Sequence, residues 1–458
     1  MNTATAALTP PDTLFNGGRL GPCLGAVALI SLLAFEAMAV STAMPAVAEA
    51  LDGLRFYALA FGGPLAASVL GMALAGPWSD RRGAWQPSLV GLLLFAAGLL
   101  VAGLANQMPM LVLGRLLQGL GGGMLGVTLY VGMGQVVPAP LHPRLFGLFA
   151  AAWVVPGLVG PTAAALMVQA LGWRSIFLLV LLLVPVAAAM LLPAFLRLPL
   201  QAATGGAAAG RASPRLVWAW LGAGGALTLH AMASLEAPLR WLALAAGLAT
   251  VLWAASQLLP AGSLRARAGL PAVVALRALL AAAFATAEVF IPLMLTGVHG
   301  WTLVQAGMAL SVGAVFWSLG SAIQSRIQDA HRRRRGLVAG FCMVALGILA
   351  TALPLVAGWH PVWVVPAWGL AGLGIGLGFP MLSVLTLSLS AAGEQGRNAS
   401  ALQLGDALGC SAALAVAGAL FSAAGPSAMA TGSLWVLLLA GALAALGAWL
   451  APRAFAQA

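Results

Sequence analysis

The chain alternates long apolar runs with short breaks rich in polar residues, glycine or proline, and this alternation constrains the fold more than any other feature. A helix needs about 20 apolar residues to cross the roughly 30 Å hydrocarbon core of a bilayer. About fourteen such runs occur, at residues 22–48, 56–78, 88–106, 108–136, 143–170, 174–196, 215–234, 238–259, 270–297, 302–325, 336–357, 361–390, 399–422 and 431–451. With 62% hydrophobic and 7% charged residues, the chain lacks the charge that a soluble surface needs, so we predict an all-α integral membrane protein.

The runs fall into groups of six, two and six, which predicts two six-helix bundles and two additional central helices. The predicted divisions are an N-terminal segment (1–21), a first bundle (22–196), a linker (197–214), the two additional helices (215–259), a second bundle (260–451) and a C-terminal segment (452–458). The fourth helix of each bundle is rich in glycine, at residues 119–126 and 369–380, which indicates a faint internal repeat. We expect these glycines to let helix backbones approach closely; the G-x-G-x-x-G match within residues 121–126 follows no strand and is not a nucleotide signature.

The distribution of arginine predicts the orientation. All 21 basic residues are arginine, and the formal net charge is +11. With the N-terminus inside, 16 arginines fall on the inner side, three on the outer side, and Arg115 and Arg277 lie within spans. Short cytoplasmic loops carry such an excess, so we predict a multi-pass protein of the inner (plasma) membrane with both termini in the cytoplasm. The arginines form no basic face with interleaved aromatic residues, which argues against nucleic acid as a partner.

Three acids lie within predicted spans: Glu36, Glu288 and Asp406. An ionised carboxylate is costly in hydrocarbon, so such acids face a cavity or a partner, or stay protonated. Glu36 lies near the middle of its helix and is a candidate for proton or substrate binding, the alternative being a permanently protonated, hydrogen-bonded acid. Glu288 is eleven residues from Arg277 on the same helix face, roughly 16 Å away, so the two cannot pair directly. Asp406 is a weaker candidate, because it could lie near the cytoplasmic end of its helix.

Six parts of the chain carry short motifs, in chain order Phe35–Pro45, Gly76–Gly83, Arg115–Gly121, Gly157–Ala165, Gly172–Phe177 and Ile291–Leu293 with Ala306–Gly307. Together, in this order and spacing, they resemble the major facilitator superfamily, in its 14-span drug:proton antiporter branch. The sequence departs from the family pattern at Ala84 and Trp85, where two basic residues are expected. Met38 and Ser41 replace a threonine and an asparagine near the acid of the first span.

The resemblance implies the fold of two six-helix bundles with two additional helices, and it implies roles for particular residues. Glu36 takes the position of the family's acid, and Arg115 has a role in proton transfer, with structural anchoring as the alternative. A conformational latch between the halves is implied for Gly76, Asp80, Arg81 and Gly83. Antiporter-type helix packing, with a kink in the fifth span, is implied for Gly157, Gly160 and Pro161.

We therefore predict a secondary active transporter that exports amphiphilic, cationic drugs or toxic compounds in exchange for protons, by alternating access. It would need no cofactor and no metal, only the proton gradient, and its partners would be a small amphiphilic molecule, protons and membrane lipids, with a monomer as the unit. The alternative within transport is a proton-coupled exporter or symporter of one endogenous metabolite. An enzyme is disfavoured because the sequence contains no HExxH, GxSxG or P-loop motif. A membrane sensor is disfavoured because the sequence shows no soluble output domain.

Overall fold

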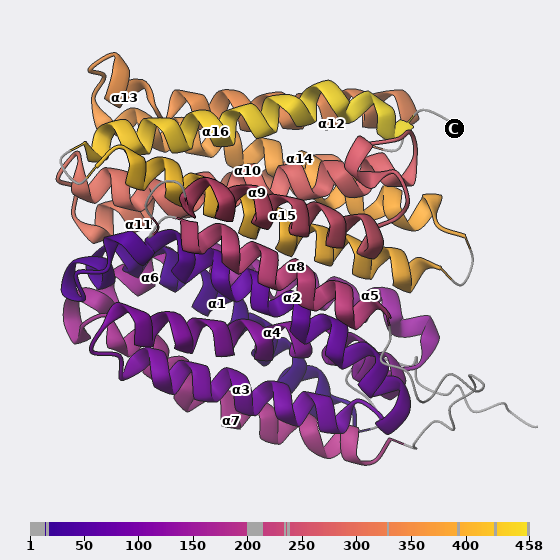
Figure 1. The fold of residues 1–458 in the computed structure, drawn as a ribbon. Helices are drawn as coiled ribbons and strands as arrows, with labels where there is room; N and C mark the ends of the chain where they lie inside the picture. The colour runs from indigo at the N-terminus through magenta and orange to yellow at the C-terminus, as the bar shows by residue number, and fades with distance from the viewer. Residues whose placement is uncertain are drawn as a thin grey trace, which may run out of the picture.

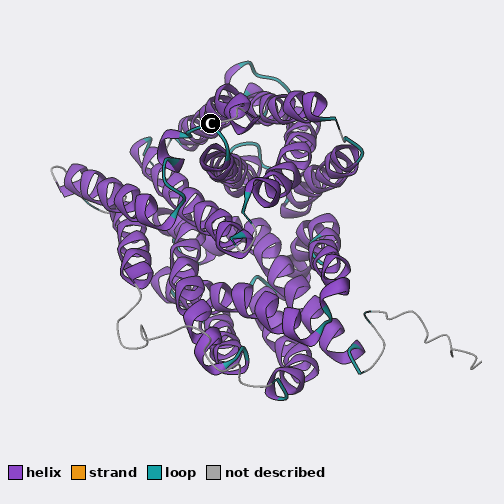
Figure 2. Ribbon diagram, turned by 90° about the vertical axis from the view of Figure 1, so that its right-hand side faces the viewer, coloured by secondary structure: helices purple, strands orange, loops and turns teal. Residues whose placement is uncertain are grey.

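The computed structural model describes residues 14, 18–198, 214–232, 235, 239–327, 329–391, 394–425 and 428–455. All regular elements within these residues are helices, which confirms the predicted all-α membrane fold (Figure 2). A helix satisfies its own backbone hydrogen bonds, as a segment in lipid must. In this part of the chain, thirteen helices are long and apolar enough to cross a membrane. Helix α8 (Pro214–Ala231) lies beside them but carries Arg215 and His230, which lower its hydropathy.

The first half of the chain forms the helices α1 (Leu20–Ala50), α2 (Tyr57–Arg82), α3 (Trp85–Gly103), α4 (Met108–Val136), α5 (His142–Ala151), α6 (Val154–Leu171) and α7 (Arg174–Leu196). Helices α5 and α6 together make the predicted fifth span. Helix α6 continues through Pro161, and the predicted fifth span is interrupted at residues 152–153, between α5 and α6. The kink expected at Gly160 and Pro161 stays a prediction. Pro156 has no N–H to bond the Ala152 carbonyl, which instead accepts the Ser31 hydroxyl at 3.0 Å.

The second half comprises α8, α9 (Leu239–Leu258), α10 (Leu270–Gly297), α11 (Leu303–Ser325), α12 (Ala330–Ala350), α13 (Leu353–Val356), α14 (Val364–Leu389), α15 (Gln395–Ala423) and α16 (Met429–Leu450). The predicted linker of residues 197–214 and the predicted N-terminal segment lie mostly outside the described residues, and so do residues 456–458 of the predicted C-terminal segment.

The two bundles repeat one packing pattern. Helix α4 packs against α2 and α3 as α14 packs against α11 and α12, and α1 packs against α6 and α7 as α10 packs against α15 and α16. A β-carbon on Gly119 of α4 would overlap the Pro64 carbonyl oxygen of α2, and one on Gly372 of α14 would overlap the Gly313 carbonyl oxygen of α11. The predicted packing role of these glycines is thus confirmed, at matching positions of both bundles.

The bundles meet along a seam made of three helix pairs: α1 with α10, α2 with α15, and α6 with α11. Viewed along the helices, the molecule shows two groups of helix ends on either side of this seam (Figure 2). Helices α8 and α9 pack on each other, and α8 lies against both α2 and α15 (Figure 1). The additional helices therefore cover one edge of the seam, whereas the α6/α11 edge has no such cover among the described residues.

Candidate functional site

Glu36 of α1 and Arg115 of α4 form an ion pair inside the first bundle. Arg115 Nη1 donates to Glu36 Oε1 and, at 2.9 Å, to Gln118 Oε1, and its Nε donates to the Ala60 carbonyl at 3.2 Å. Glu36 is 5% exposed and Arg115 is 6% exposed. Each charge is compensated only by the other, so protonation of Glu36 would leave a buried guanidinium without a counter-ion. The pair can therefore couple proton binding to a local rearrangement.

A second ion pair lies in the second bundle. Arg277 Nε of α10 donates to Asp406 Oδ2 of α15 at 3.1 Å. Arg277 Nη1 donates to the Ser383 hydroxyl at 2.6 Å and to the Phe379 carbonyl at 3.2 Å, both on α14, and the guanidinium lies over the Phe379 ring. Asp406 Oδ1 is buried and has no hydrogen-bond partner in the described part of the chain. The sequence did not predict this pair, although it placed both charges within spans.

Glu288 differs from the other two acids. It is half-buried on α10, next to the seam, where the Ser41 hydroxyl of α1 donates to its backbone carbonyl at 3.4 Å. Its carboxylate forms no ion pair and no hydrogen bond within the described residues. Arg277, on the same helix, pairs with Asp406 instead, in keeping with the predicted separation. Of the three intramembrane acids, Glu288 is thus the one without a cation beside it.

The predicted latch residues lie at the end of α2 and show no latch contact. Asp80 and Arg81 are exposed, and neither has an ion pair with another described residue. Gly83 ends the helix with φ at +72°, a conformation that favours glycine. A β-carbon on Gly76 would meet open space, so close packing does not require a glycine there.

The predicted antiporter segment packs at the seam. A β-carbon on Gly160 would lie 3.4 Å from Met38 Cβ of α1, and one on Gly157 would lie 3.6 Å from Ala314 Cβ of α11. The Pro161 carbonyl oxygen would lie 2.7 Å from a β-carbon on Gly307, also of α11. This segment therefore holds the two bundles close together, and its functional role remains a prediction.

Hydrogen bonds join the two bundles toward one end of the seam. Tyr57 Oη donates to the Val289 carbonyl at 2.9 Å, and Ser411 Oγ donates to the Gly62 carbonyl at 2.8 Å. These residues lie at the start of α2 and in the second halves of α10 and α15. These hydrogen bonds lie at one end of the seam. Arg453, near the C-terminal end of the described chain, lies at the opposite end.

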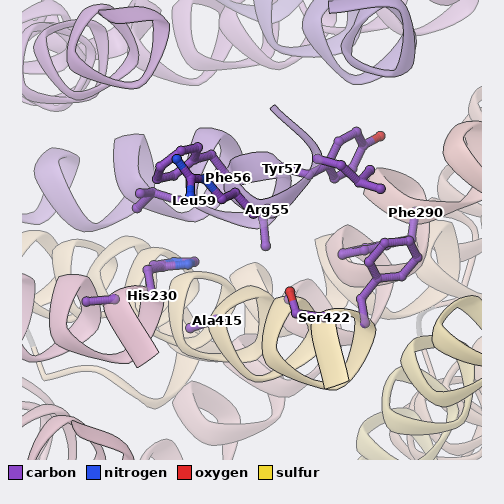
Figure 3. A pocket seen from close by; sticks show the side chains of 13 residues that line it. Arg55, Phe56, Tyr57, Leu59, His230, Phe290, Ala415 and Ser422 are labelled. Atoms are coloured by element: carbon purple, nitrogen blue, oxygen red, sulfur yellow. The ribbon is translucent and has the colours of Figure 1, made fainter. Parts of the chain in front are cut away.

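His230 of α8 inserts where α2 and α15 meet. It is 5% exposed, its Nε2 lies 3.5 Å from Ser411 Oγ, and its ring occupies the space that a β-carbon on Gly62 would need. A cavity of about 230 Å³ adjoins it, between the start of α2 and the end of α15 (Figure 3). Arg55 and Ser422 are the other polar residues along its lining besides Tyr57. The sequence showed His230 only as an isolated histidine, because nothing in its spacing indicates which helices it joins.

Comparison with known proteins agrees with this architecture. The sequence model of the Major Facilitator Superfamily matches residues 26–414. A probable multidrug-efflux transporter of Mycobacterium tuberculosis is 28% identical over 369 residues, covering 78% of this chain and 77% of that protein. A probable actinorhodin transporter of Streptomyces coelicolor is 28% identical over 453 residues, covering 91% of this chain and 74% of that protein.

Solved structures share the fold. The POT family transporter PepTSo superposes with a TM-score of 0.67 at 14% identity, covering 94% of this chain and 98% of that one. A D-xylose-proton symporter gives a TM-score of 0.66 at 15% identity and covers 94% of this chain and 98% of its own. At these identities the likeness establishes the fold alone.

Proposed function

This chain belongs to the major facilitator superfamily, and from that premise we propose that it exports amphiphilic, cationic compounds in exchange for protons. Relatives named as multidrug efflux transporters support a small-molecule substrate. The two relatives described above are named as transporters, which supports transport rather than catalysis as the activity. The proton gradient is proposed as the only energy source, with no cofactor.

The unpaired carboxylate of Glu288 is the observation that carries this proposal. Glu36 and Asp406 each have an arginine beside them, so a cationic substrate would have to displace a buried guanidinium to bind either one. Glu288 has no such competitor in the described residues, and it lies on α10 at the seam between the bundles. A proton and a hydrophobic cation that compete for this carboxylate cannot bind together, so each cycle exchanges one for the other.

Glu36 and Arg115 serve as the coupling pair in this proposal. Protonation of Glu36 weakens its bond to Arg115, while Gln118 and the Ala60 carbonyl still hold the guanidinium. The local charge then changes from neutral to positive in the middle of α1 and disfavours a cationic substrate nearby. Release of the proton restores the pair.

The seam supplies the conformational change. Its hydrogen bonds close the end near Tyr57, Gly62 and Ser411, while the latch residues Asp80 and Arg81 at the other end stay exposed. With both termini in the cytoplasm of an inner-membrane protein, as the arginine distribution predicts, the end tied by these hydrogen bonds faces the outside. Separation of the seam bonds, together with engagement of the latch, would give the opposite state. One chain contains both bundles, so a monomer suffices.

A narrower candidate function is export of one endogenous metabolite. The relative that matches the largest share of this chain among those cited, 91%, is named as a probable actinorhodin transporter. In that case the seam and the coupling pair would act in the same way, and only the range of substrates would differ.

Transport by proteoliposomes tests the proposal. A fluorescent hydrophobic cation should accumulate only when a pH gradient is imposed, and Glu288→Gln should abolish that accumulation. The matched control is Glu49→Gln, which removes an exposed glutamate at the end of α1 and should transport normally. Cation movement that ignores the gradient, or normal gradient-driven transport by Glu288→Gln, would show that the mechanism is wrong. Competition with a panel of unrelated compounds separates a broad substrate range from a single metabolite.

A further inference from the structure

The connection between α9 and α10 borders a half-open cavity of about 300 Å³ that lies apart from the seam and from both buried ion pairs. Arg265 and Arg267 line it together with the hydroxyl-bearing residues Ser256 and Ser263. The cavity is at the end of the bundle where the described chain finishes. The Gly269 N–H donates to the Arg453 carbonyl at 3.0 Å, and Arg453 Nη1 donates to the Arg265 carbonyl at 3.3 Å.

The connection has a defined shape. Gly262 has φ at +92°, and Ala266 has φ at +45°, a conformation that side-chain-bearing residues seldom adopt. The Arg267 N–H donates to the Gly262 carbonyl at 3.2 Å, and a β-carbon on Gly262 would lie 2.6 Å from Arg267 Cδ. The stem of Arg267 therefore lies on the Gly262 backbone. Ser263 Oγ donates to the Pro260 carbonyl at 2.7 Å and fixes the turn.

The charges around this cavity have one sign. No carboxylate lines it, and neither Arg265 nor Arg267 forms an ion pair with a described residue. Arg453 adds a third positive charge beside them and lies over the Trp449 ring, 5.1 Å from its centroid. The side chains of Arg265 and Arg267 are exposed. Positive charges on one surface without an acid disfavour one another, and an anion bound among them would reduce that repulsion.

The surroundings indicate which anion. Leu264, in the lining, is 50% exposed, and Trp449 is 68% exposed. Exposed tryptophan and leucine next to arginine are typical of the boundary between hydrocarbon and head groups. Basic pockets between membrane helices on the cytoplasmic side bind anionic head groups. A cavity of this size accepts a head group but not a whole lipid, whose chains would extend along the exposed apolar side chains.

We propose that this cavity binds the phosphate group of an anionic membrane lipid, with Arg265 and Arg267 as its ligands and Arg453 beside them. A charge bias of cytoplasmic loops alone would scatter arginines over the surface, whereas here the backbone of residues 259–269 gathers them around one cavity. The bound lipid would join the end of α9 and the connection after it to Arg453, at the end of the second bundle. The proposal does not depend on the transported substrate.

Native mass spectrometry of the purified full chain with phosphatidylglycerol, and with phosphatidylcholine for comparison, tests this site. The double variant Arg265→Gln/Arg267→Gln should bind phosphatidylglycerol at least about tenfold more weakly, because each arginine near the surface contributes to the attraction. The matched control is Arg334→Gln/Arg335→Gln, which removes the same charge from exposed positions in α12, outside the cavity. This control should bind as the unsubstituted protein does, within about twofold.

Three results would overturn the proposal. Equal losses in both double variants would mean that bulk surface charge, and not a site, attracts the lipid. Unchanged binding in Arg265→Gln/Arg267→Gln would exclude the cavity. Displacement of phosphatidylglycerol by an equal concentration of inorganic phosphate would assign the site to free phosphate. Thermal unfolding of each variant verifies that it is folded. If Arg265→Gln/Arg267→Gln is not folded, the single variant Arg267→Gln replaces it and should show a smaller loss of phosphatidylglycerol binding.

Discussion

Replacement of Glu36 by glutamine tests the coupling pair directly. The substitution removes the carboxylate charge and leaves the Arg115 guanidinium buried, with only Gln118 and the Ala60 carbonyl still beside it. Removal of one partner from a buried ion pair costs about 3–5 kcal/mol. Because the glutamine oxygen can still accept the Arg115 hydrogen bond, we expect the lower end of that range. A loss of about 3 kcal/mol corresponds to a shift of roughly 150-fold in the unfolding equilibrium.

A double-mutant cycle separates the pair from its members. Arg115→Gln leaves the opposite charge buried and should destabilise by a similar amount, about 3 kcal/mol. The double variant Glu36→Gln/Arg115→Gln buries no charge and should unfold within about 1 kcal/mol of the unsubstituted protein. Unfolding in mixed detergent micelles measures all three, with Glu49→Gln as the exposed control. If the two single losses simply add in the double variant, Glu36 and Arg115 do not interact and the description of the site is wrong.

The same double variant distinguishes coupling from support of the fold. It should be stable but should use a pH gradient less effectively in proteoliposomes, because no titrating carboxylate remains at this position and only Glu288 still exchanges a proton for the substrate. A purely structural ion pair would instead allow a stable double variant to transport with full proton coupling. That result would remove Glu36 from the mechanism while leaving the fold intact.

Other substitutions test the packing and the seam. Gly119→Ala should destabilise by about 1–3 kcal/mol in the same unfolding assay, because its β-carbon would overlap backbone of α2, whereas Gly126→Ala, with open space in the same helix, should be neutral. Ser411→Ala removes a hydrogen bond across the seam and should raise the fraction of molecules in which the seam is open at the Tyr57 end. Cysteines introduced along the seam should then be labelled faster. Unchanged labelling would contradict the closure assigned to this end. Asp406→Asn should lower the free energy of unfolding by about 3 kcal/mol, because it leaves Arg277 buried without its partner. Addition of Arg277→Gln should restore most of that stability. If the double variant is no more stable than Asp406→Asn, Arg277 and Asp406 do not form a pair.

The sequence predicted the fold well because membrane insertion depends on local properties. Each span depends on the hydropathy of about 20 consecutive residues. A helix forms its backbone hydrogen bonds within one segment, whereas a strand needs a partner strand from elsewhere in the chain. The close packing at Gly119 and Gly372 was also predictable, since small residues at helical spacing leave room for a neighbouring backbone. A kink was predicted at Gly160 and Pro161, but no break in the fifth span was predicted. The break between α5 and α6 lies next to Pro156 and to a hydroxyl from α1, a neighbour that the local sequence does not indicate.

The site was predicted only as a set of charges without partners. Glu36 and Arg115 are 79 residues apart and Arg277 and Asp406 are 129 apart, so their pairing depends on which helices become neighbours. Within one helix spacing is more informative: Arg115 and Gln118, three residues apart on one helix face, are hydrogen-bonded. The lone position of Glu288 was only partly predictable: helix spacing excluded Arg277 as its partner, but it could not exclude an arginine on another helix.

The additional helices make the two edges of the seam unequal. Helix α8 lies across α2 and α15, so any rocking of the bundles must move α8 with one of them and slide it past the other. The His230 ring fills the space that a side chain at position 62 of α2 would need, and its Nε2 lies 3.5 Å from Ser411 Oγ of α15. Helix α8 packs more extensively against α2 than against α15. If the seam opens, we therefore expect α8 to move with the first bundle and to slide along the surface of α15 beside His230.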